Sequence, residues 1–413
     1  MKYDVIIIGG GPAGMMAAIA MCDSSLKTAI IEHGDKVGRK ILVTGNGKCN
    51  LTNMNMGRDC YNSDSDGAFY DVIENYDPNW LIGKFCDMGM LTRERDGYVY
   101  PASEQASTVL DTLRNAVNKA GCDVISESNV KLASRISDRE KGFIVSTDKG
   151  EYTCDKLILA CGSKCYSKTG SDGFGYKLAR YFGHRIIDVI PALGPIECSE
   201  NFFPALKGVR AKGKITISGY VNLSDRGEIQ FTEYGISGIP VFQLSRHIIR
   251  AINMGEDIEV ELDLYPDHAE ELVKMYLDKF RSTAEDVTML LNSMINKKLA
   301  VVIANRCKIK PSAPAASLSD SDLDKLCDMI KHFKVSPVEG RGYDMAQVCA
   351  GGVDLEEIDT STMESLKCKG LYICGEMLDV DGICGGYNLH WAFASGYLAG
   401  LAAAGIVKST LVT

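Results

Sequence analysis

The sequence predicts an α/β protein with a Rossmann-like nucleotide-binding domain that a β-rich insert interrupts. The β-branched run Tyr3 to Ile8 leads directly into a glycine-rich turn, and an apolar helical stretch follows it. Near residue 190 the composition changes to prolines and alternating polar and apolar residues, which marks the insert. With 413 residues the chain exceeds what one hydrophobic core usually covers, so more than one domain is expected.

The glycine turn has the spacing Gly9-x-Gly11-x-x-Gly14, with Pro12 and Ala13 before its last glycine. In dinucleotide-binding folds the first glycine makes a tight turn, the second lets the backbone approach a pyrophosphate, and the third packs helix against strand. We therefore expect a phosphate-binding site at the N-terminus of the first helix.

An acidic residue stands where such folds bind a ribose. The second apolar strand, Thr28 to Ile31, ends at Glu32, which lies 18 residues after Gly14. A carboxylate there accepts hydrogen bonds from a ribose 2′-hydroxyl and disfavours a 2′-phosphate. A glycine turn alone is weak evidence, but strand, helix and acid agree here and predict a dinucleotide without saying which one.

Charge and cysteine content exclude several classes of protein. Lys and Arg number 45 against 54 Asp and Glu, a net charge of −9, so nucleic acid is not expected as a partner. The 15 cysteines are odd in number, scattered and without a CxxC pair, which indicates a reduced cytoplasmic protein. The uncharged stretch Trp391 to Val407 is short and rich in Gly and Ala, so we expect a buried helix and no membrane partner.

Four long segments carry a family resemblance. The polar run Gly38 to Asn53, GRKILVTGNGKCNLTN, is the first, and residues 157–184, 231–245 and 346–396 are the others. Together they resemble the BaiN-like flavoproteins, also called aminoacetone-oxidase-type or YhiN-type FAD proteins. The resemblance implies a glutathione-reductase-type FAD-binding fold.

The domain boundaries follow from the composition and this resemblance. We expect the FAD-binding domain at residues 1–190 and again at 341–413. Between them, residues 191–340 are expected to form a β-barrel-like inserted domain that carries a small helical subdomain at about 266–310.

The resemblance also implies which residues contact FAD. Glu376 follows an apolar strand and is expected to reach the ribityl or pyrophosphate part, and the start of the last helix is expected to face the flavin N1/O2 edge. The expected contacts come from the glycine turn, the polar loop, the ends of four strands and the last helix: Gly9, Gly11, Pro12, Ala13, Gly14, Glu32, Arg39, Lys40, Thr44, Gly45, Asn46, Cys49, Asn50, Val130, Ala160, Gly162, Gly375, Glu376, Gly385, Gly386, Tyr387, Asn388 and Leu389.

The family implies two activities on small-molecule substrates. One is the reduction of ring double bonds in 3-oxo-Δ4/Δ6 bile acids, and the other is the oxidation of aminoacetone by oxygen; we favour the first. Hydride transfer at flavin N5 needs a proton donor, for which Tyr387 is the better candidate and His390 the alternative. NADH or NADPH would bind only transiently, because no second glycine-turn unit exists.

Two other classes of function remain open from the sequence: a non-catalytic flavin-binding redox sensor and a nucleic-acid-modifying enzyme. For the second, a local basic cluster comprises Lys207, Arg210, Lys212 and Lys214, although most such clusters are solvated faces. Cys349 is expected to be a core thiol without a partner at dithiol spacing, and no metal site is expected. No feature of the sequence indicates an oligomeric state.

Overall fold

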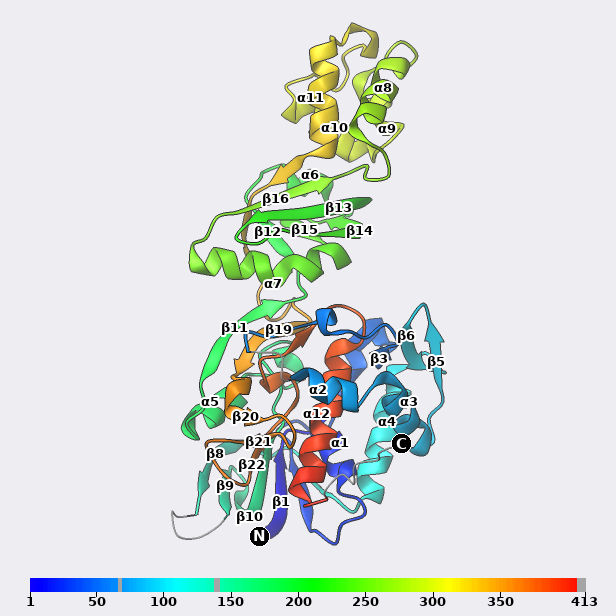
Figure 1. Cartoon of the computed structure of the whole chain (residues 1–413). Coiled ribbons are helices and arrows are strands. Elements are labelled where there is room, and N and C mark those ends of the chain that lie inside the picture. The colour runs from blue at the N-terminus through cyan, green and yellow to red at the C-terminus, as the bar shows by residue number, and fades with distance from the viewer. Residues whose placement is uncertain (66–68, 137–141, 407–413) are drawn as a thin grey trace. The chain divides into compact units, whose positions relative to one another are not determined.

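The computed structural model describes residues 1–65, 69–136 and 142–406, and the chain forms two compact units (Figure 1). Unit 1 contains Met1–Ile190 and the chain from Val348 onward, and unit 2 contains Pro191–Gln347. The chain re-enters unit 1 at Val348, whereas the second part of the FAD-binding domain was expected to begin at residue 341. Arg341 stays with unit 2 because its Nη1 donates a hydrogen bond to Glu197 at 2.8 Å.

A nine-stranded sheet forms the centre of unit 1. Its parallel part has the order β22 (Leu371–Ile373), β10 (Gly150–Leu159), β1 (Lys2–Ile8), β2 (Thr28–Ile31) and β7 (Asp123–Ile125). The β-branched runs of β1 and β2 form strands because they are buried on both faces, as central parallel strands usually are. The carboxyl ends of these strands consequently meet at one edge, where ligands bind in such sheets.

Antiparallel strands extend the sheet on one side. β8 (Val130–Arg135) pairs with β9 (Phe143–Thr147), which pairs with the first half of β10, while β20 (Ile358–Asp359) and β21 (Glu364–Ser365) lie beyond β22. Since β10 is long, its first half pairs with β9 and its second half with β22.

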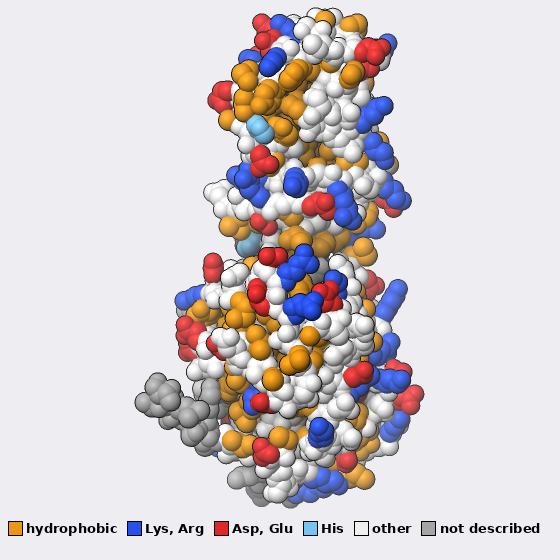
Figure 2. Space-filling view, turned by 90° about the vertical axis from the view of Figure 1, so that its right-hand side faces the viewer, with side chains coloured by type: hydrophobic (Ala, Val, Ile, Leu, Met, Phe, Trp, Pro, Cys, Tyr) orange, Lys and Arg blue, Asp and Glu red, His pale blue; other side chains and the backbone are white. Residues whose placement is uncertain are grey.

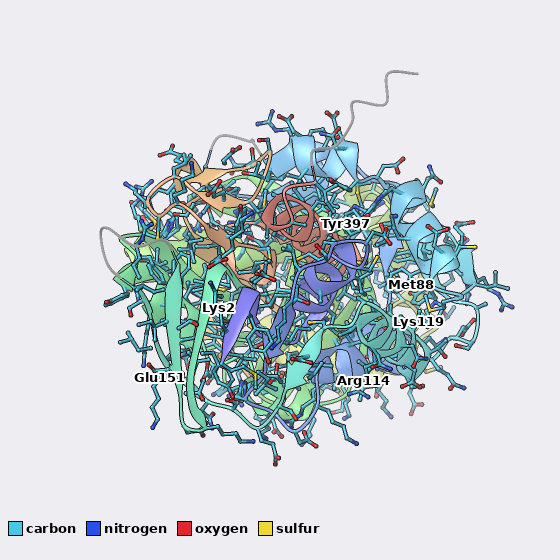
Figure 3. The ribbon with its side chains drawn as sticks, turned by 90° about the horizontal axis from the view of Figure 1, so that it is seen from below. Lys2, Met88, Arg114, Lys119, Glu151 and Tyr397 are labelled. Carbon is cyan, nitrogen blue, oxygen red and sulfur yellow. The ribbon has the colours of Figure 1, made fainter. Side chains whose placement is uncertain are left out.

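Two helices pack unusually closely beside this sheet. α1 (Pro12–Ala20) and α12 (Tyr387–Ala403) lie side by side, as Figure 3 shows from below. A Cβ on Gly396 or Gly400 would overlap the backbone of α1, so glycine is required at both positions. The uncharged stretch from Trp391 is thus a buried helix, although Val407 lies outside the described residues. In the part of the chain that the structure describes, no helix is long and apolar enough to span a membrane.

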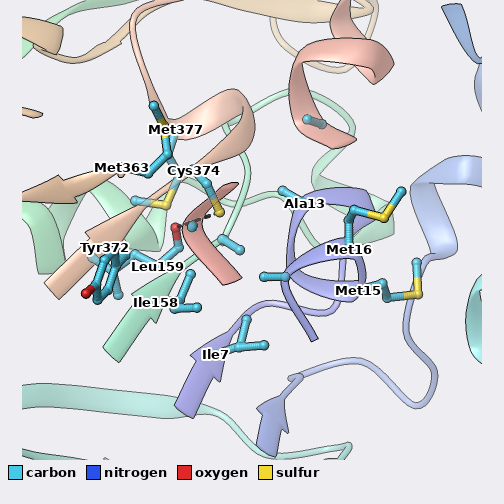
Figure 4. Packing of buried hydrophobic residues seen from close by; sticks show 14 of the residues in the cluster. Ile7, Ala13, Met15, Met16, Ile158, Leu159, Met363, Tyr372, Cys374 and Met377 are labelled. Atoms are coloured by element: carbon cyan, nitrogen blue, oxygen red, sulfur yellow. Dashed lines mark hydrogen bonds between the residues drawn. The ribbon is translucent and has the colours of Figure 1, made fainter. Parts of the chain in front are cut away.

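The core of unit 1 lies between the sheet and α1. Ile7 of β1 is opposite Ile158 of β10, and Met15 and Met16 of α1 are fully buried (Figure 4). The other elements of unit 1 surround this core: β3 (Thr52–Asn53), β4 (Tyr61–Asn62), α2 (Phe69–Asn75), α3 (Pro78–Asp87), β5 (Thr92–Arg95), β6 (Tyr98–Pro101), α4 (Ala106–Lys119), α5 (Phe174–Tyr181), β11 (Ile186–Ala192), β19 (Val348–Val353) and β23 (Asp381–Gly382).

Unit 2 contains a seven-stranded antiparallel sheet, against which α7 (Ile239–Met254) packs. In the described residues the pairing order has two ends, β17 and β18, so this barrel-like insert is built on a sheet that does not close. From end to end the strands are β17 (Phe333–Val335), β16 (Ile258–Asp263), β13 (Arg210–Gly219), β14 (Leu223–Phe231), β15 (Gly235–Ser237), β12 (Ile196–Cys198) and β18 (Pro337–Gly340).

The helical part of unit 2 is longer than the sequence indicates. It comprises α8 (Glu270–Phe280), α9 (Val287–Asn292), α10 (Lys297–Arg306) and α11 (Asp320–Lys331), whereas the expected segment ends near 310. α10 ends at Arg306, just before Lys308 with its positive φ of 61°, and a capping box between Ser319 and Asp322 starts α11.

Candidate functional site

The glycine turn joins β1 to α1 at the carboxyl edge of the sheet, and its glycines are needed for different reasons. Gly9 has φ +104°, and a Cβ there would overlap the backbone of Ala160. A Cβ on Gly14 would overlap the carbonyl oxygen of Gly9. Gly11, at the N-terminus of α1, has φ −74°, and a Cβ there meets no atom within 4 Å. Open space at Gly11 fits a group that approaches the backbone from outside the protein, as a pyrophosphate does.

Pro12 and Ala13 form the first turn of α1. Pro12 is the first helical residue, where its lack of an N–H costs no hydrogen bond. Ala13 packs against α12, because its backbone fills the space that a side chain at Gly396 would need. The predicted pyrophosphate-binding turn is therefore braced by the last helix of the chain.

Glu32 is held beside the glycine turn. Its Oε2 accepts a hydrogen bond from Gly10 N–H at 2.9 Å, and its Oε1 accepts one from Gly34 N–H at 2.7 Å. The side chain is only 11% exposed, and His33 Nδ1 lies 3.4 Å from Oε1. Each carboxylate oxygen has a further lone pair, so a ribose hydroxyl can still donate to it.

The polar loop predicted to bind the cofactor folds as a kinked 3₁₀ segment, Arg39–Gly47. Gly45 and Asn46 both have φ +54°, and Cys49, at φ +59°, is fully buried. Two side chains of the loop donate to backbone carbonyls: Arg39 Nη2 to Lys168 O, which lies in a distant part of the chain, at 3.1 Å, and Thr44 Oγ1 to Ile41 O at 2.7 Å.

Asn50 leaves an acceptor unused at the end of this loop. Its Oδ1 is buried and has no hydrogen-bond donor within the described residues. A Cβ placed on Gly386, which precedes α12, would lie 2.9 Å from this oxygen. A buried acceptor without a donor is unfavourable, so the site fits a ligand that supplies one.

Lys40 of the loop forms an ion pair with Glu376. Lys40 Nζ lies 2.7 Å from Glu376 Oε2, with the side chains 20% and 18% exposed. Burial alone lowers the pKa of Lys40, but the Glu376 carboxylate reverses this effect and leaves the pKa above its ordinary value. Glu376 Oε1 accepts a hydrogen bond from Cys349 N–H at 3.3 Å. Glu376 therefore binds protein groups on both oxygens, and Lys40 carries the positive charge of the site.

Two glycines in a conformation that other residues rarely adopt precede α12. Gly385 and Gly386 have φ +137° and +97°, and no side chain caps the helix. Asn388 was expected to contact the cofactor, but its amide binds Gly382 through both atoms, with Oδ1 accepting at 2.9 Å and Nδ2 donating at 2.7 Å. Leu389 is partly buried against the hydrophobic core. Free backbone N–H groups thus begin the helix, as binding of an anionic edge requires.

Tyr387 is buried at the start of α12. Its side-chain hydroxyl donates to Asn55 O at 2.8 Å, and its carbonyl accepts from Tyr61 OH at 3.1 Å. Burial, with a smaller contribution from the hydrogen bond to Cys60, raises the pKa of Tyr387 above its ordinary value. The hydroxyl is consequently protonated at neutral pH.

His390 does not have the surroundings of a proton donor. It is fully buried, with Nδ1 2.8 Å from Thr52 Oγ1 and Nε2 2.7 Å from Tyr76 O. Since a carbonyl only accepts, Nε2 carries the proton and Nδ1 accepts from the threonine hydroxyl. Burial lowers the pKa of His390 to about 4, so the ring is neutral. His390 was expected as the alternative proton donor, and in the structure its ring joins α12 to β3 and to Tyr76, which follows α2.

The remaining predicted residues lie near strand ends. Ala160 and Gly162 follow β10, and Gly162 has φ +72°. Gly375 follows β22, has φ +73°, and receives support from Ser395, whose Oγ accepts its N–H at 3.0 Å. Val130 begins β8, just after Ser128, whose N–H donates to Glu32 O at 3.0 Å.

Cys349, whose N–H binds Glu376, also contacts a second thiol. Cys349 was expected to be a core thiol with no partner at dithiol spacing, and its Sγ lies 3.2 Å from Cys165 Sγ. The two cysteines are 184 residues apart in the chain, so no spacing rule identifies them. They become neighbours because β19 passes the segment that follows β10.

Comparisons with known proteins agree with this geometry. The model of the family described as HI0933-like protein Rossmann domain matches residues 3–402. A 3-dehydro-bile acid delta(4,6)-reductase from Clostridium scindens is 39% identical over 407 residues, 96% of this chain and 98% of the relative. A ribosomal RNA dihydrouridine synthase from Haemophilus influenzae is 32% identical over 402 residues, 96% of this chain and 97% of the relative.

A solved structure shares the fold. The 3-ketosteroid-delta4-(5alpha)-dehydrogenase from Rhodococcus jostii RHA1, in complex with 4-androstene-3,17-dione, superposes with a TM-score of 0.51. The sequences are 13% identical, and the match covers 98% of this chain and 97% of that one. At this identity the likeness is one of fold alone.

Proposed function

The chain belongs to the HI0933-like Rossmann-domain family, and we propose that it reduces a C=C bond conjugated to a carbonyl group, using FAD. The observation that carries this proposal is the 39% identity, over 96% of the chain, to a 3-dehydro-bile acid delta(4,6)-reductase. The coarser conclusion, that the protein is an FAD-dependent oxidoreductase, does not depend on the choice of substrate.

The residues of unit 1 fit FAD in several independent ways. The open backbone at Gly11 and the start of α1 suit the pyrophosphate, and Glu32 suits the ribose beside it. Lys40 adds positive charge, and the unused Oδ1 of Asn50 and the uncapped start of α12 suit the polar edge of the ring. Once bound and reduced by a hydride donor such as NADH or NADPH, the flavin would supply a hydride from its N5 atom.

Reduction of a conjugated C=C bond also needs a proton. The hydride adds to the carbon β to the carbonyl, and a proton must reach the α carbon. We assign this proton to Tyr387, since this residue begins α12, whose uncapped N-terminus we assign to the flavin edge, and its donor hydrogen bond to Asn55 O orients the hydroxyl. A substrate that approaches Tyr387 must draw this hydrogen bond away from Asn55.

A 3-oxo-Δ4 or Δ6 bile acid intermediate is the substrate that this proposal favours, with NADH or NADPH as a transient hydride donor. The test of the donor is anaerobic: the FAD-loaded protein is mixed with NADH or NADPH, and the flavin absorbance is followed. Rapid bleaching by one of them supports a reductase cycle. If neither bleaches the flavin while aminoacetone does, the protein is an amine oxidase instead.

Uridine in ribosomal RNA is a second candidate substrate, because a dihydrouridine synthase is 32% identical to this chain. The chemistry is the same, since the uracil C5=C6 bond is conjugated to the C4 carbonyl. The local basic cluster gives little support to RNA binding, because two of its cations are paired with acidic side chains. Lys207 lies 2.6 Å from Glu233, and Arg210 lies 3.0 Å from Glu228. On the face shown in Figure 2, Lys and Arg side chains are dispersed among Asp and Glu.

The two substrate classes are distinguished by one comparison. The reduced, FAD-loaded protein is incubated with a 3-oxo-Δ4 bile acid and, separately, with unmodified ribosomal RNA. Formation of the saturated ketone without dihydrouridine supports the first candidate. Dihydrouridine formation without bile acid turnover supports the second.

A further inference from the structure

Two buried cysteines lie in contact next to the Lys40–Glu376 ion pair. Cys165 follows β10 and Cys349 lies in β19, and their Sγ atoms are 3.2 Å apart. Cys165 is 0% exposed and Cys349 is 2% exposed. Because a disulfide has an S–S distance of about 2.0 Å, the two sulfurs need to approach by only about 1 Å.

The surroundings of the pair make its two sulfurs chemically different. The Cys165 thiol has one proton to donate. Val348 O, which lies 2.9 Å from Cys165 Sγ, and Cys349 Sγ are both close enough to accept it. Burial alone raises the pKa of Cys349, but hydrogen bonds from Cys165, Ser163 and the backbone of Lys164 lower it below its ordinary value. Burial and the neighbouring Cys349 raise the pKa of Cys165. Cys349 is therefore the nucleophile and Cys165 the proton-bearing partner.

The pair also touches the proposed cofactor site. Cys349 N–H donates to Glu376 Oε1 at 3.3 Å, and Glu376 Oε2 binds Lys40. The backbone of Cys349 is thus hydrogen-bonded directly to the Lys40–Glu376 pair, which we assign to FAD binding. A covalent bond at Cys349 changes the position of the backbone N–H that holds Glu376.

We propose that Cys165 and Cys349 form an oxidation site, at which a small peroxide converts the two thiols into a disulfide. The Cys349 thiol gives up its proton and its sulfur attacks one peroxide oxygen, so that an S–O bond forms and the O–O bond breaks; the leaving hydroxide or alkoxide takes up that proton and departs as water or alcohol. Cys165 sulfur then attacks Cys349 Sγ, the S–S bond forms, and the hydroxyl leaves as water with the proton from Cys165. The thiols lose two electrons, and the peroxide takes them up.

Burial selects the oxidant and protects the product. Exposure of 0% and 2% excludes bulky disulfides as oxidants and favours a small one such as hydrogen peroxide, which is about the size of two water molecules. Cys165 lies in contact with it, so a sulfenic acid on Cys349 condenses before a second oxidation. A small dithiol restores both thiols by thiol–disulfide exchange.

The test reads the covalent bond directly and needs no cofactor. The full-length protein is treated with hydrogen peroxide, denatured, alkylated and digested, and its peptides are analysed by mass spectrometry. We expect a cross-linked Cys165–Cys349 peptide, the loss of two of the 15 alkylatable thiols, and recovery of both after dithiothreitol. A sulfinic acid on Cys349 without any cross-link contradicts the proposal, as does oxidation confined to other cysteines.

Variants separate the roles of the two sulfurs. Cys349→Ser should abolish the cross-link and leave Cys165 alkylatable, and Cys165→Ser should leave a sulfenic acid on Cys349 that dimedone traps. Cys154→Ser is the matched control, because Cys154 is 1% exposed in the same unit and should leave the cross-link intact. If a serine variant fails to fold, the wild-type peptide map still decides the proposal.

One consequence rests on the proposed function. Oxidation should lower the affinity for FAD several-fold through Glu376, as measured by fluorescence titration of oxidised and reduced protein. If the cross-link forms but FAD affinity is unchanged, the oxidation site stands and its link to the cofactor is wrong. If FAD binds neither form, the cross-link is unaffected and the proposed function fails.

Discussion

Lys40 and Glu376 form an ion pair of 2.7 Å although 336 residues separate them in the chain. Lys40 comes from the kinked loop near the N-terminus, and Glu376 comes from the segment after β22. This contact joins the first and last parts of unit 1 at the carboxyl edge of the sheet. The site therefore exists only when both ends of unit 1 are folded together.

A double-mutant cycle measures this coupling. Lys40→Met and Glu376→Gln should each lower the free energy of unfolding, because each leaves a half-buried charge without its partner. In the double variant the two losses should not add, with a coupling energy of about 0.5–3 kcal/mol. Urea unfolding of the four proteins without cofactor gives the values. Additive losses would show that the pair contributes nothing to the fold.

Gly11 and Gly14 should respond differently to substitution. Gly11→Val should leave the thermal unfolding of the cofactor-free protein nearly unchanged but reduce bound FAD at least tenfold, since the side chain enters only the open space. Gly14→Ala should lower stability by roughly 1–3 kcal/mol because its Cβ overlaps the carbonyl of Gly9. The measurements are bound flavin per chain and thermal unfolding. Normal flavin content in Gly11→Val would remove Gly11 from the binding site.

His390 should make stability depend on pH in mild acid. Its pKa is about 4 in the folded chain against 6.5 ordinarily, so between these values the unfolded chain binds one more proton than the folded chain. Stability should therefore fall as pH drops from 6.5 to 4, by roughly 1.4 kcal/mol per pH unit from this residue.

His390→Gln is the matched variant for this prediction. The introduced amide can still donate to Tyr76 O and accept from Thr52 Oγ1, so turnover should be retained. The free energy of unfolding should then depend less steeply on pH, because the amide does not titrate. Unfolding curves at several pH values provide the comparison. A large loss of turnover with intact flavin content would restore His390 as a proton donor.

Tyr387→Phe tests the assigned proton donor. The variant should keep FAD but lower kcat by about 10²–10⁴-fold, the usual contribution of a positioned acid. Tyr61→Phe is the control, because it removes a neighbouring hydroxyl that donates to Tyr387 O. Equal effects of the two substitutions would indicate a structural role for Tyr387.

Local sequence rules predicted the parts of the site that depend on neighbours in the chain. Gly9, Gly11, Gly14 and Glu32 could be identified because the strand, turn and helix that place them are contiguous. The roles of His390 and Asn388 could not, since both depend on distant partners such as Thr52 and on the exact fold of the backbone near Gly382.

The same limit applies to the fold. The β-branched runs predicted the parallel strands, and the Gly- and Ala-rich last segment predicted a buried helix. The helix α11 was missed because prolines at 311 and 314 end the preceding helical pattern, while the capping box that restarts it is a short signal. The contact of Cys165 with Cys349 joins residues 184 apart in the chain, so no local pattern predicts it.

The most direct test of the central claim is reoxidation of the reduced flavin by a substrate. The FAD-loaded protein is photoreduced without oxygen, so no nicotinamide is needed, and is mixed with a 3-oxo-Δ4 bile acid or with its saturated 3-oxo analogue. We predict that the flavin absorbance returns in proportion to the unsaturated compound, and that the saturated compound has no effect. A flavin that stays reduced with the unsaturated bile acid and with ribosomal RNA, yet reoxidises with oxygen, would contradict the account.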